Sequence, residues 1–285
     1  MKAQATCFGA GTIVNAIATG KGAAFGLALR ATATAETRPE GFGVRVHVPA
    51  SIDPALAQSS ATRVLRRSRR KAGLEVSVDS DIPASRGLKS SSAVANAVVL
   101  ASARALGLDL GAYQVIRIGV DAALDASVTI TGAFDDACAS FFGGVVVTNN
   151  AARKLLASNR LPEGLMAVVQ IPRRTIRKPS LRGTDFSAIR PQVEEAFRLA
   201  LDGEYFRAIE ANSAAYAPLL GVDEGPAIRA RAAGAVAAGV TGTGPAIIAL
   251  AKPGHVDAVR RAMADGDSEI RVVGLNTTES REVVA

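Results

Sequence analysis

Patterns typical of strands and of helices occur in both halves of this 285-residue sequence, and together they predict an α+β fold. The two kinds of pattern do not alternate regularly, as they would in a doubly wound parallel sheet. The composition changes after the turn at Asn149-Asn150, which favours two domains, residues 1–155 and 156–285. A hydrophobic content of 48% suits globular domains and excludes a disordered chain.

Each element is predicted from its periodicity. Apolar residues alternate with polar ones in Val44–Val48 and Leu74–Val78, which is the pattern of half-buried strands. The other segments are assigned from helical spacing or from short apolar runs. In the first half we expect strands at 44–48, 74–78 and 141–148 and helices at 55–72, 93–106 and 111–124. In the second half we expect strands at 167–171, 246–250 and 270–273, helices at 192–201, 205–212, 227–238 and 256–264, and an exposed basic loop at 173–182.

Charge and composition limit the possible partners. With 33 basic and 26 acidic residues, the chain has a net charge of +7, which favours anionic ligands. The densest basic run, Arg63–Lys71, has two interpretations, a nucleic-acid-binding patch or the solvated face of a helix. Aromatic residues make up 4% of the chain and do not interleave with this run, so the solvated face is favoured and no nucleic-acid partner is expected.

The sequence contains no pattern for zinc or for a membrane. Cys7 and Cys138 lie far apart, and neither they nor His47 and His255 have the spacing of metal ligands, so buried free thiols are expected. No apolar run reaches the ~20 residues that span a bilayer. The N-terminus lacks the apolar stretch of a signal peptide, which predicts a cytoplasmic protein.

The segment Pro83–Ala93 is the most informative in the chain, because it joins a glycine, a lysine and three serines to the start of a helix. The first turn of a helix presents unpaired backbone N–H groups and positive dipole charge, and it therefore binds anions. Gly87 allows close backbone approach, and Lys89 adds a positive charge. The common P-loop pattern is absent, and a plain, serine-capped core helix is the structural alternative.

Three glycine-rich motifs in order resemble those of the GHMP kinase superfamily. Pro83–Ala93 matches its second motif, Thr241–Ala246 matches the third, and Gly9–Asn15 with Ala18–Ala24 matches the first more loosely. The segment Thr131-Gly-Ala-Phe-Asp-Asp136 lies between the second and third. The lysine at 89, where most relatives have glycine, the serine triplet and residues 17–22 make the chain similar in particular to the archaeal-type shikimate kinases.

This resemblance implies a fold and a reaction. The fold would be the two-domain GHMP kinase fold, with an N-terminal half like domain 2 of ribosomal protein S5 and a ferredoxin-like C-terminal half. ATP would bind between the halves, with shikimate beside its γ-phosphate, and Mg²⁺ would accompany the nucleotide. The product would be shikimate 3-phosphate, and the rival acceptor within the superfamily is another small alcohol such as homoserine.

The resemblance also assigns residues to roles. Asp135 would take the hydroxyl proton, with Asp136 as the alternative base, and Lys21 would lie near Asp135 and supply charge. Magnesium would be held by Ser91 and Asp125. The ATP-binding residues would be Pro83, Ser85, Arg86, Gly87, Leu88, Lys89, Ser90, Ser91, Ser92 and Ala93, and the substrate-binding residues Asn15, Thr241, Gly242, Thr243 and Gly244.

Taken alone, these residues also have structural interpretations. An aspartate pair at a helix start serves as a cap and a first-turn acid, and Lys21 suits a solvated turn. Asp125 suits a surface helix end, and Thr241–Gly244 suits a tight turn before a strand.

Overall fold

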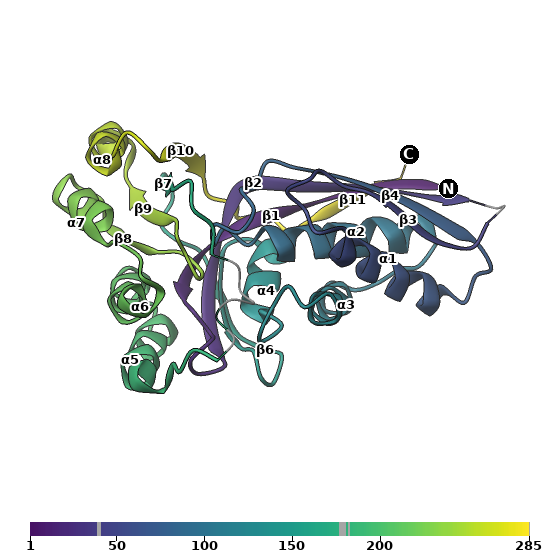
Figure 1. Cartoon of the computed structure of the whole chain (residues 1–285), viewed down its shortest axis with the longest axis horizontal. Helices are drawn as coiled ribbons and strands as arrows, with labels where there is room; N and C mark the ends of the chain where they lie inside the picture. Colours follow the sequence, from purple (N-terminus) through teal and green to yellow (C-terminus); the bar gives the residue numbers. More distant parts are fainter. Residues whose placement is uncertain (39–40, 177–180, 182, 285) are drawn as a thin grey trace.

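The computed structural model describes residues 1–38, 41–176, 181 and 183–284. Two sheets lie side by side, each covered on one face by helices (Figure 1). The elements of the first half are β1 (Lys2–Val14), β2 (Lys21–Arg38), β3 (Gly43–His47), α1 (Pro54–Ser68), β4 (Gly73–Ser80), α2 (Ser90–Ala105), α3 (Ala112–Asp125), α4 (Phe134–Phe142), β5 (Val145–Asn149) and β6 (Lys154–Asn159). The predicted α+β class is confirmed.

The second half supplies a smaller sheet and its covering helices. Its elements are β7 (Met166–Ile171), a 3₁₀ turn (Ser187–Ile189), α5 (Arg190–Leu201), α6 (Tyr205–Leu220), α7 (Gly225–Ala232), β8 (Ala237–Val240), β9 (Ile247–Ala251), a 3₁₀ turn (Pro253–His255), α8 (Val256–Met263), β10 (Glu269–Gly274) and β11 (Arg281–Val284). The four-stranded sheet has the order β10-β7-β9-β8, and all of its pairs are antiparallel.

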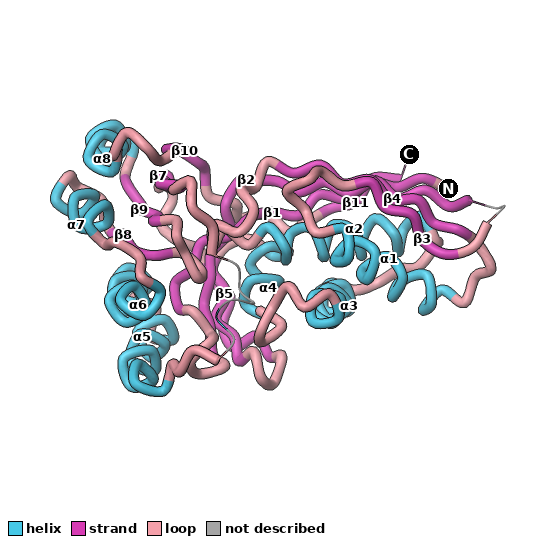
Figure 2. The backbone as a smooth tube through the Cα atoms, in the orientation of Figure 1, coloured by secondary structure: helices cyan, strands magenta, loops and turns pink. Residues whose placement is uncertain are grey.

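The larger sheet contains seven strands and takes in both ends of the chain. Its main order is β11-β1-β2-β4-β3, while β5 pairs with β2 and with β6. The last strand, β11, returns from the second half to pair antiparallel with β1, so the two termini lie close together (Figure 2).

A long hairpin of β1 and β2 is the backbone of this sheet, and its alternation explains why it forms. In the outer half of β2 buried Ala31, Ala33 and Ala35 alternate with more exposed residues, while Thr32 faces Thr6 of β1 with their hydroxyls 2.9 Å apart. Towards the turn, both strands become buried on both faces because helices cover one side and the second half of the chain covers the other.

Helix α2 lies against β1 and β2 at the centre of the larger layer. Almost every residue from Ala93 to Ala105 is buried, and most are alanine or valine, so the helix packs closely on all sides. Helix α1 packs on α2, and its buried residues include Leu56, Ala61 and Val64. The basic run covers the last turns of α1 and the residues after Ser68, and most of its basic side chains are exposed.

Four predicted boundaries were wrong by four residues or more. The helix expected over 55–72 ends at Ser68, because Arg69 at φ 54° turns the chain towards β4. The segment 141–148 begins as the end of α4; Gly143 and Gly144, at φ of 66° and 60°, turn the chain, and the strand starts at Val145. The helix expected over 227–238 ends at Ala232, because Gly234 at φ 98° starts the turn into β8. The helix expected over 205–212 continues to Leu220 despite Pro218. Part of the basic loop expected at 173–182 lies outside the described residues.

Candidate active site

The loop before α2 lines a cavity of about 380 Å³ between the two halves of the molecule. Helix α2 begins at Ser90, and its N-cap position is Lys89 at φ 64°, so no serine side chain caps this helix. Gly87 also has a positive φ, 84°, which places the loop backbone in a conformation that glycine adopts without strain. Of the predicted ATP-binding residues, the ones that line the cavity are Pro83, Ser85, Gly87, Leu88, Lys89, Ser90, Ser91 and Ser92.

Arg86 and Ala93 do not belong to this lining. Ala93 is buried inside α2. The Arg86 guanidinium points away and donates to the backbone carbonyl of Arg173 at 2.7 Å, and burial lowers its pKa. In the structure Arg86 therefore joins the loop to the second half of the chain.

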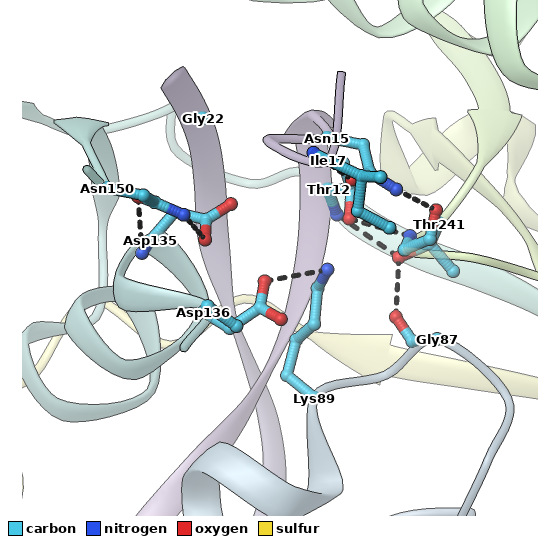
Figure 3. Close-up of polar contacts among 12 residues, drawn as sticks. Thr12, Asn15, Ile17, Gly22, Gly87, Lys89, Asp135, Asp136, Asn150 and Thr241 are labelled. Carbon is cyan, nitrogen blue, oxygen red and sulfur yellow. Dashed lines mark hydrogen bonds and ion pairs between the residues drawn. The ribbon is translucent and has the colours of Figure 1, made fainter. Parts of the chain in front are cut away.

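The third motif, Thr241–Ala246, contacts the loop that contains Gly87 (Figure 3). The Thr241 hydroxyl donates to the carbonyl oxygen of Gly87 at 3.0 Å and accepts from the backbone N–H of Thr12 at 3.1 Å. The Gly242 N–H donates to the Thr12 hydroxyl at 2.7 Å, and the Asn15 amide donates to the Gly242 carbonyl at 2.8 Å. All three glycine-rich motifs thus meet at one place.

These contacts divide the five predicted substrate-binding residues into two groups. Asn15, Gly242 and Thr243 line a second, smaller cavity of about 20 Å³. Thr241 and Gly244 line neither cavity within the described part of the chain; Thr241 joins the loops, and the N–H of Gly244 closes the turn onto the Thr241 carbonyl.

The two aspartates begin helix α4 and differ in what they contact. Asp135 is buried and accepts a hydrogen bond of 2.7 Å from the side-chain amide of Asn150. The Asn150 oxygen accepts in turn from the backbone N–H of Asp135 at 3.1 Å and from the Thr148 hydroxyl at 2.7 Å. The other carboxylate oxygen of Asp135 occupies the space that a side chain at Gly22 would fill. Asp135 is therefore held in one orientation.

Asp136 forms an ion pair with Lys89, with Oδ1 and Nζ 2.8 Å apart. Both side chains are about 5% exposed or less. Lys89 and Asp136 line both cavities, whereas Asp135 lines only the smaller one. The pair is thus the boundary between the large cavity and the small one.

Lys21 is not brought to Asp135 in the predicted way. It is the first residue of β2, and neighbouring residues of a strand point to opposite faces, so Gly22 faces Asp135 while Lys21 faces the second half of the chain. Its ammonium pairs with Glu194 of α5 at 2.9 Å and lies 5.6 Å from the centre of the Phe197 ring.

Asp125 also has a different partner from the expected one. It is the last residue of α3, is half exposed, and lies 2.7 Å from both Nε and a terminal nitrogen of Arg63 on α1. The hydrogen bond from Arg63 lowers the pKa of Asp125. Among the described residues, Asp125 lines neither the large cavity nor the small one.

Sequence reasoning did not identify Asn150, Thr148, Thr12 or Gly22 as site residues. Asn150 was noticed only as part of a turn, since an asparagine pair is a common turn signal. Asn150 lies in the turn between β5 and β6, and this hairpin places it against Asp135 of α4. The described residues contain no cluster of three or more histidine, cysteine or acidic groups that could hold a metal, and no helix long and apolar enough to span a membrane.

A cavity lined by a loop of glycine, lysine and serines at a helix start, next to a fixed, buried carboxylate, suits the chemistry of a small-molecule phosphotransferase. Models of two protein families match the chain: the GHMP kinases N-terminal domain over residues 55–144 and the GHMP kinases C-terminal domain over residues 228–267. The chain belongs to the GHMP kinases, as the motifs predicted.

Curated relatives match over most of their length. The chain is 43% identical to a shikimate kinase of Thermococcus kodakarensis, over 87% of this chain and 91% of the relative. It is 41% identical to a shikimate kinase of Pyrococcus furiosus over 89% and 93%, and 38% identical to that of Methanosarcina mazei over 98% and 96%.

Solved structures share the fold. A homoserine kinase from Cytophaga hutchinsonii aligns with a TM-score of 0.75 at 18% identity, over 98% of this chain and 97% of that one. A Lactococcus lactis galactokinase complexed with galactose aligns with a TM-score of 0.78 at 13% identity, over 98% and 95%. At these identities the likeness concerns the fold alone.

Proposed function

We propose that this protein transfers the γ-phosphoryl group of ATP to the 3-hydroxyl of shikimate, yielding shikimate 3-phosphate for chorismate and aromatic amino acid synthesis. Relatives about 40% identical over most of the chain carry the name shikimate kinase, which supports the choice of acceptor. The observation that supports the chemistry is the position of Asp135. Asp135 lines the small cavity, and this cavity shares two lining residues, Lys89 and Asp136, with the large cavity beside the loop Gly87–Ser92. We also propose a cytoplasmic location, where ATP is available.

The nucleotide's phosphates would lie against the loop Gly87–Ser92. Backbone N–H groups at the start of α2 and the helix dipole favour negative charge there. Ile52, Leu56 and Val128 also line the large cavity, and these residues offer apolar walls for a base.

Asp135 would act as the general base. As the shikimate oxygen bonds to the γ-phosphorus, the bond from phosphorus to the bridging β–γ oxygen breaks, the hydroxyl proton passes to Asp135, and ADP leaves. The Asn150 amide fixes one carboxylate oxygen. Since the small cavity has room for about one water-sized group, it would have to widen to admit the acceptor's ring.

The residues present suit magnesium held mainly by the nucleotide. Magnesium prefers oxygen ligands and commonly binds through one or two protein groups plus substrate phosphates. The hydroxyl of Ser91, at the exposed start of α2, lines the large cavity and would be such a protein group. The absence of an acidic cluster among the described residues argues against an all-protein cage. When bound, the ion neutralises charge on the phosphates.

A coupled assay of ADP release with shikimate, homoserine and mevalonate as separate acceptors tests this proposal. We expect turnover with shikimate and at least ~100-fold lower kcat/KM for the other two. The variant Asp135→Asn should bind ATP with unchanged affinity and lose at least ~10³-fold in kcat. A higher kcat/KM with homoserine than with shikimate would show that homoserine is the acceptor. Salt-sensitive nucleic-acid binding without any kinase activity would overturn the proposal as a whole.

A further inference from the structure

The buried ion pair of Lys89 and Asp136 lies where the transferred group must pass. Lys89 lies in the loop of the second motif and Asp136 in the first turn of α4, about 50 residues apart in sequence. Both line the large cavity and the small one. A group moving from the nucleotide to a hydroxyl beside Asp135 therefore passes the Lys89 ammonium.

The lysine is held there at a cost. Its φ of 64° is in the left-handed region, which is unfavourable for every residue except glycine. Its side chain is also about 5% exposed, and taking a charge out of water is unfavourable unless it is paired. Strain and burial together at a cavity wall favour a functional reason for a lysine at this position.

The ammonium still has donors to offer. An ammonium carries three N–H groups, and Asp136 is the one partner that the structure gives to Lys89 Nζ within the described residues. The two other N–H groups are available to phosphate oxygens. Asp136, in turn, is neutralised by Lys89, so its charge does not repel an approaching triphosphate.

We propose that Lys89 is a catalytic residue that stabilises the charge of the γ-phosphoryl group during transfer, with Asp136 as the positioning residue that aims its ammonium. This inference rests on the proposed function. It gives Lys89 the role that the sequence suggested for Lys21, whose ammonium faces Glu194 instead. It also leaves Asp135 as the carboxylate that takes the proton. The competing role for Lys89 is recognition of the acceptor's carboxylate.

The test uses a variant in which no buried charge is left alone. Lys89→Met by itself strands Asp136, so it is combined with Asp136→Asn, and the double variant's thermal midpoint is compared with that of the wild type. With shikimate as acceptor, we expect kcat to fall at least ~100-fold in the double variant while the KM for shikimate changes less than ~3-fold. Lys89→Arg should retain part of the activity, since it keeps the charge. Lys154→Met, the same change on the exposed strand β6, should leave kcat unchanged.

Two kinetic outcomes overturn the inference. One is a double variant with kcat within ~3-fold of the wild type. The other is a KM for shikimate raised more than ~30-fold at unchanged kcat, which would assign Lys89 to the acceptor's carboxylate.

A measurement without acceptor separates this inference from the proposed function. The ³¹P spectrum of bound β,γ-imido ATP should show a γ-phosphorus resonance that shifts between wild type and double variant, while the α resonance stays in place. An unshifted γ resonance, or no binding of the analogue by the folded double variant, overturns the role of Lys89. If the γ resonance differs between the two proteins but the wild type does not phosphorylate shikimate, the role of Lys89 is supported and the proposal that shikimate is the acceptor is refuted.

Discussion

Asn150 holds Asp135 from two sides, donating to its carboxylate at 2.7 Å and accepting from its backbone N–H at 3.1 Å. The backbone N–H of Asp135 can only donate and the carboxylate can only accept, so the Asn150 oxygen faces the N–H and the amide nitrogen faces the carboxylate; the Thr148 hydroxyl also donates to that oxygen. An amide in this position fixes the base without adding charge beside it.

Replacing Asn150 by aspartate should therefore damage catalysis more than folding. Asn150→Asp keeps an acceptor for the Asp135 N–H but places a second carboxylate where a donor was, and adjacent like charges raise the pKa of a carboxyl group. We expect kcat to fall ~10- to 100-fold, with part of the loss recovered at higher pH, and ATP affinity to stay within ~3-fold. Steady-state kinetics across pH 6–9 measures this. Asn149→Asp, the same change one residue earlier in the turn, is the control, and equal effects from both variants would contradict the role of Asn150.

Gly87 lies against the backbone of Thr241, so that a methyl group at position 87 would collide with the Thr241 carbonyl oxygen. Gly87→Ala should separate the second motif from the third, lower the thermal midpoint and weaken ATP binding at least ~10-fold. Gly203→Ala is a matched control, because Gly203 has a similar φ of 83° but no atom within 4 Å of the added carbon. The control should lose only about 1 kcal/mol from backbone strain and bind ATP normally. Calorimetry of unfolding and of ATP binding distinguishes the two.

The Thr241 hydroxyl serves the loop rather than a substrate, and two substitutions separate these roles. Thr241→Val keeps the shape but leaves the Thr12 N–H and the Gly87 carbonyl without their buried partner, at a cost of about 1–3 kcal/mol in the free energy of unfolding. Thr241→Ser should restore stability. Denaturant unfolding gives the free energies; a Thr241→Val protein as stable as the wild type would show that the hydroxyl does not join the motifs.

Two buried acids should make the folded protein lose stability at alkaline pH. Burial raises the pKa of the Cys138 thiol and of the Tyr216 phenol above their ordinary values of 9.0 and 10.0. Above these ordinary values the unfolded chain releases the protons while the folded chain keeps them, so unfolding becomes more favourable as pH rises. Each group contributes a slope of up to about 1.4 kcal/mol per pH unit. Urea unfolding between pH 8 and 11 should show the decline, and Cys138→Ala should remove the part that begins near pH 9.

Much of the fold and of the site was predictable because local patterns encode it. The period-two strands, the helices and the anion-binding loop follow from residue spacing and from the glycine and serines of Pro83–Ala93. The resemblance of three motifs in order located the kinase family, which the family models and the curated relatives confirm. The boundaries at Gly143 and Gly234 were wrong because alanine and valine runs suit helix and strand alike, and packing decides between them.

What the sequence by itself determined was which segments carry the chemistry. Lys89 could be recognised as a departure from the broader family pattern and Asp136 as one of two candidate bases, but nothing in their spacing shows that they touch. Only the tertiary structure decides side-chain direction and long-range pairing. It pairs Lys89 with Asp136, Lys21 with Glu194 and Asp125 with Arg63. A strand reverses its face at every residue, and a hairpin brings back a turn such as the one at Asn150. Such contacts therefore depend on how whole elements pack, which no local pattern of residues specifies.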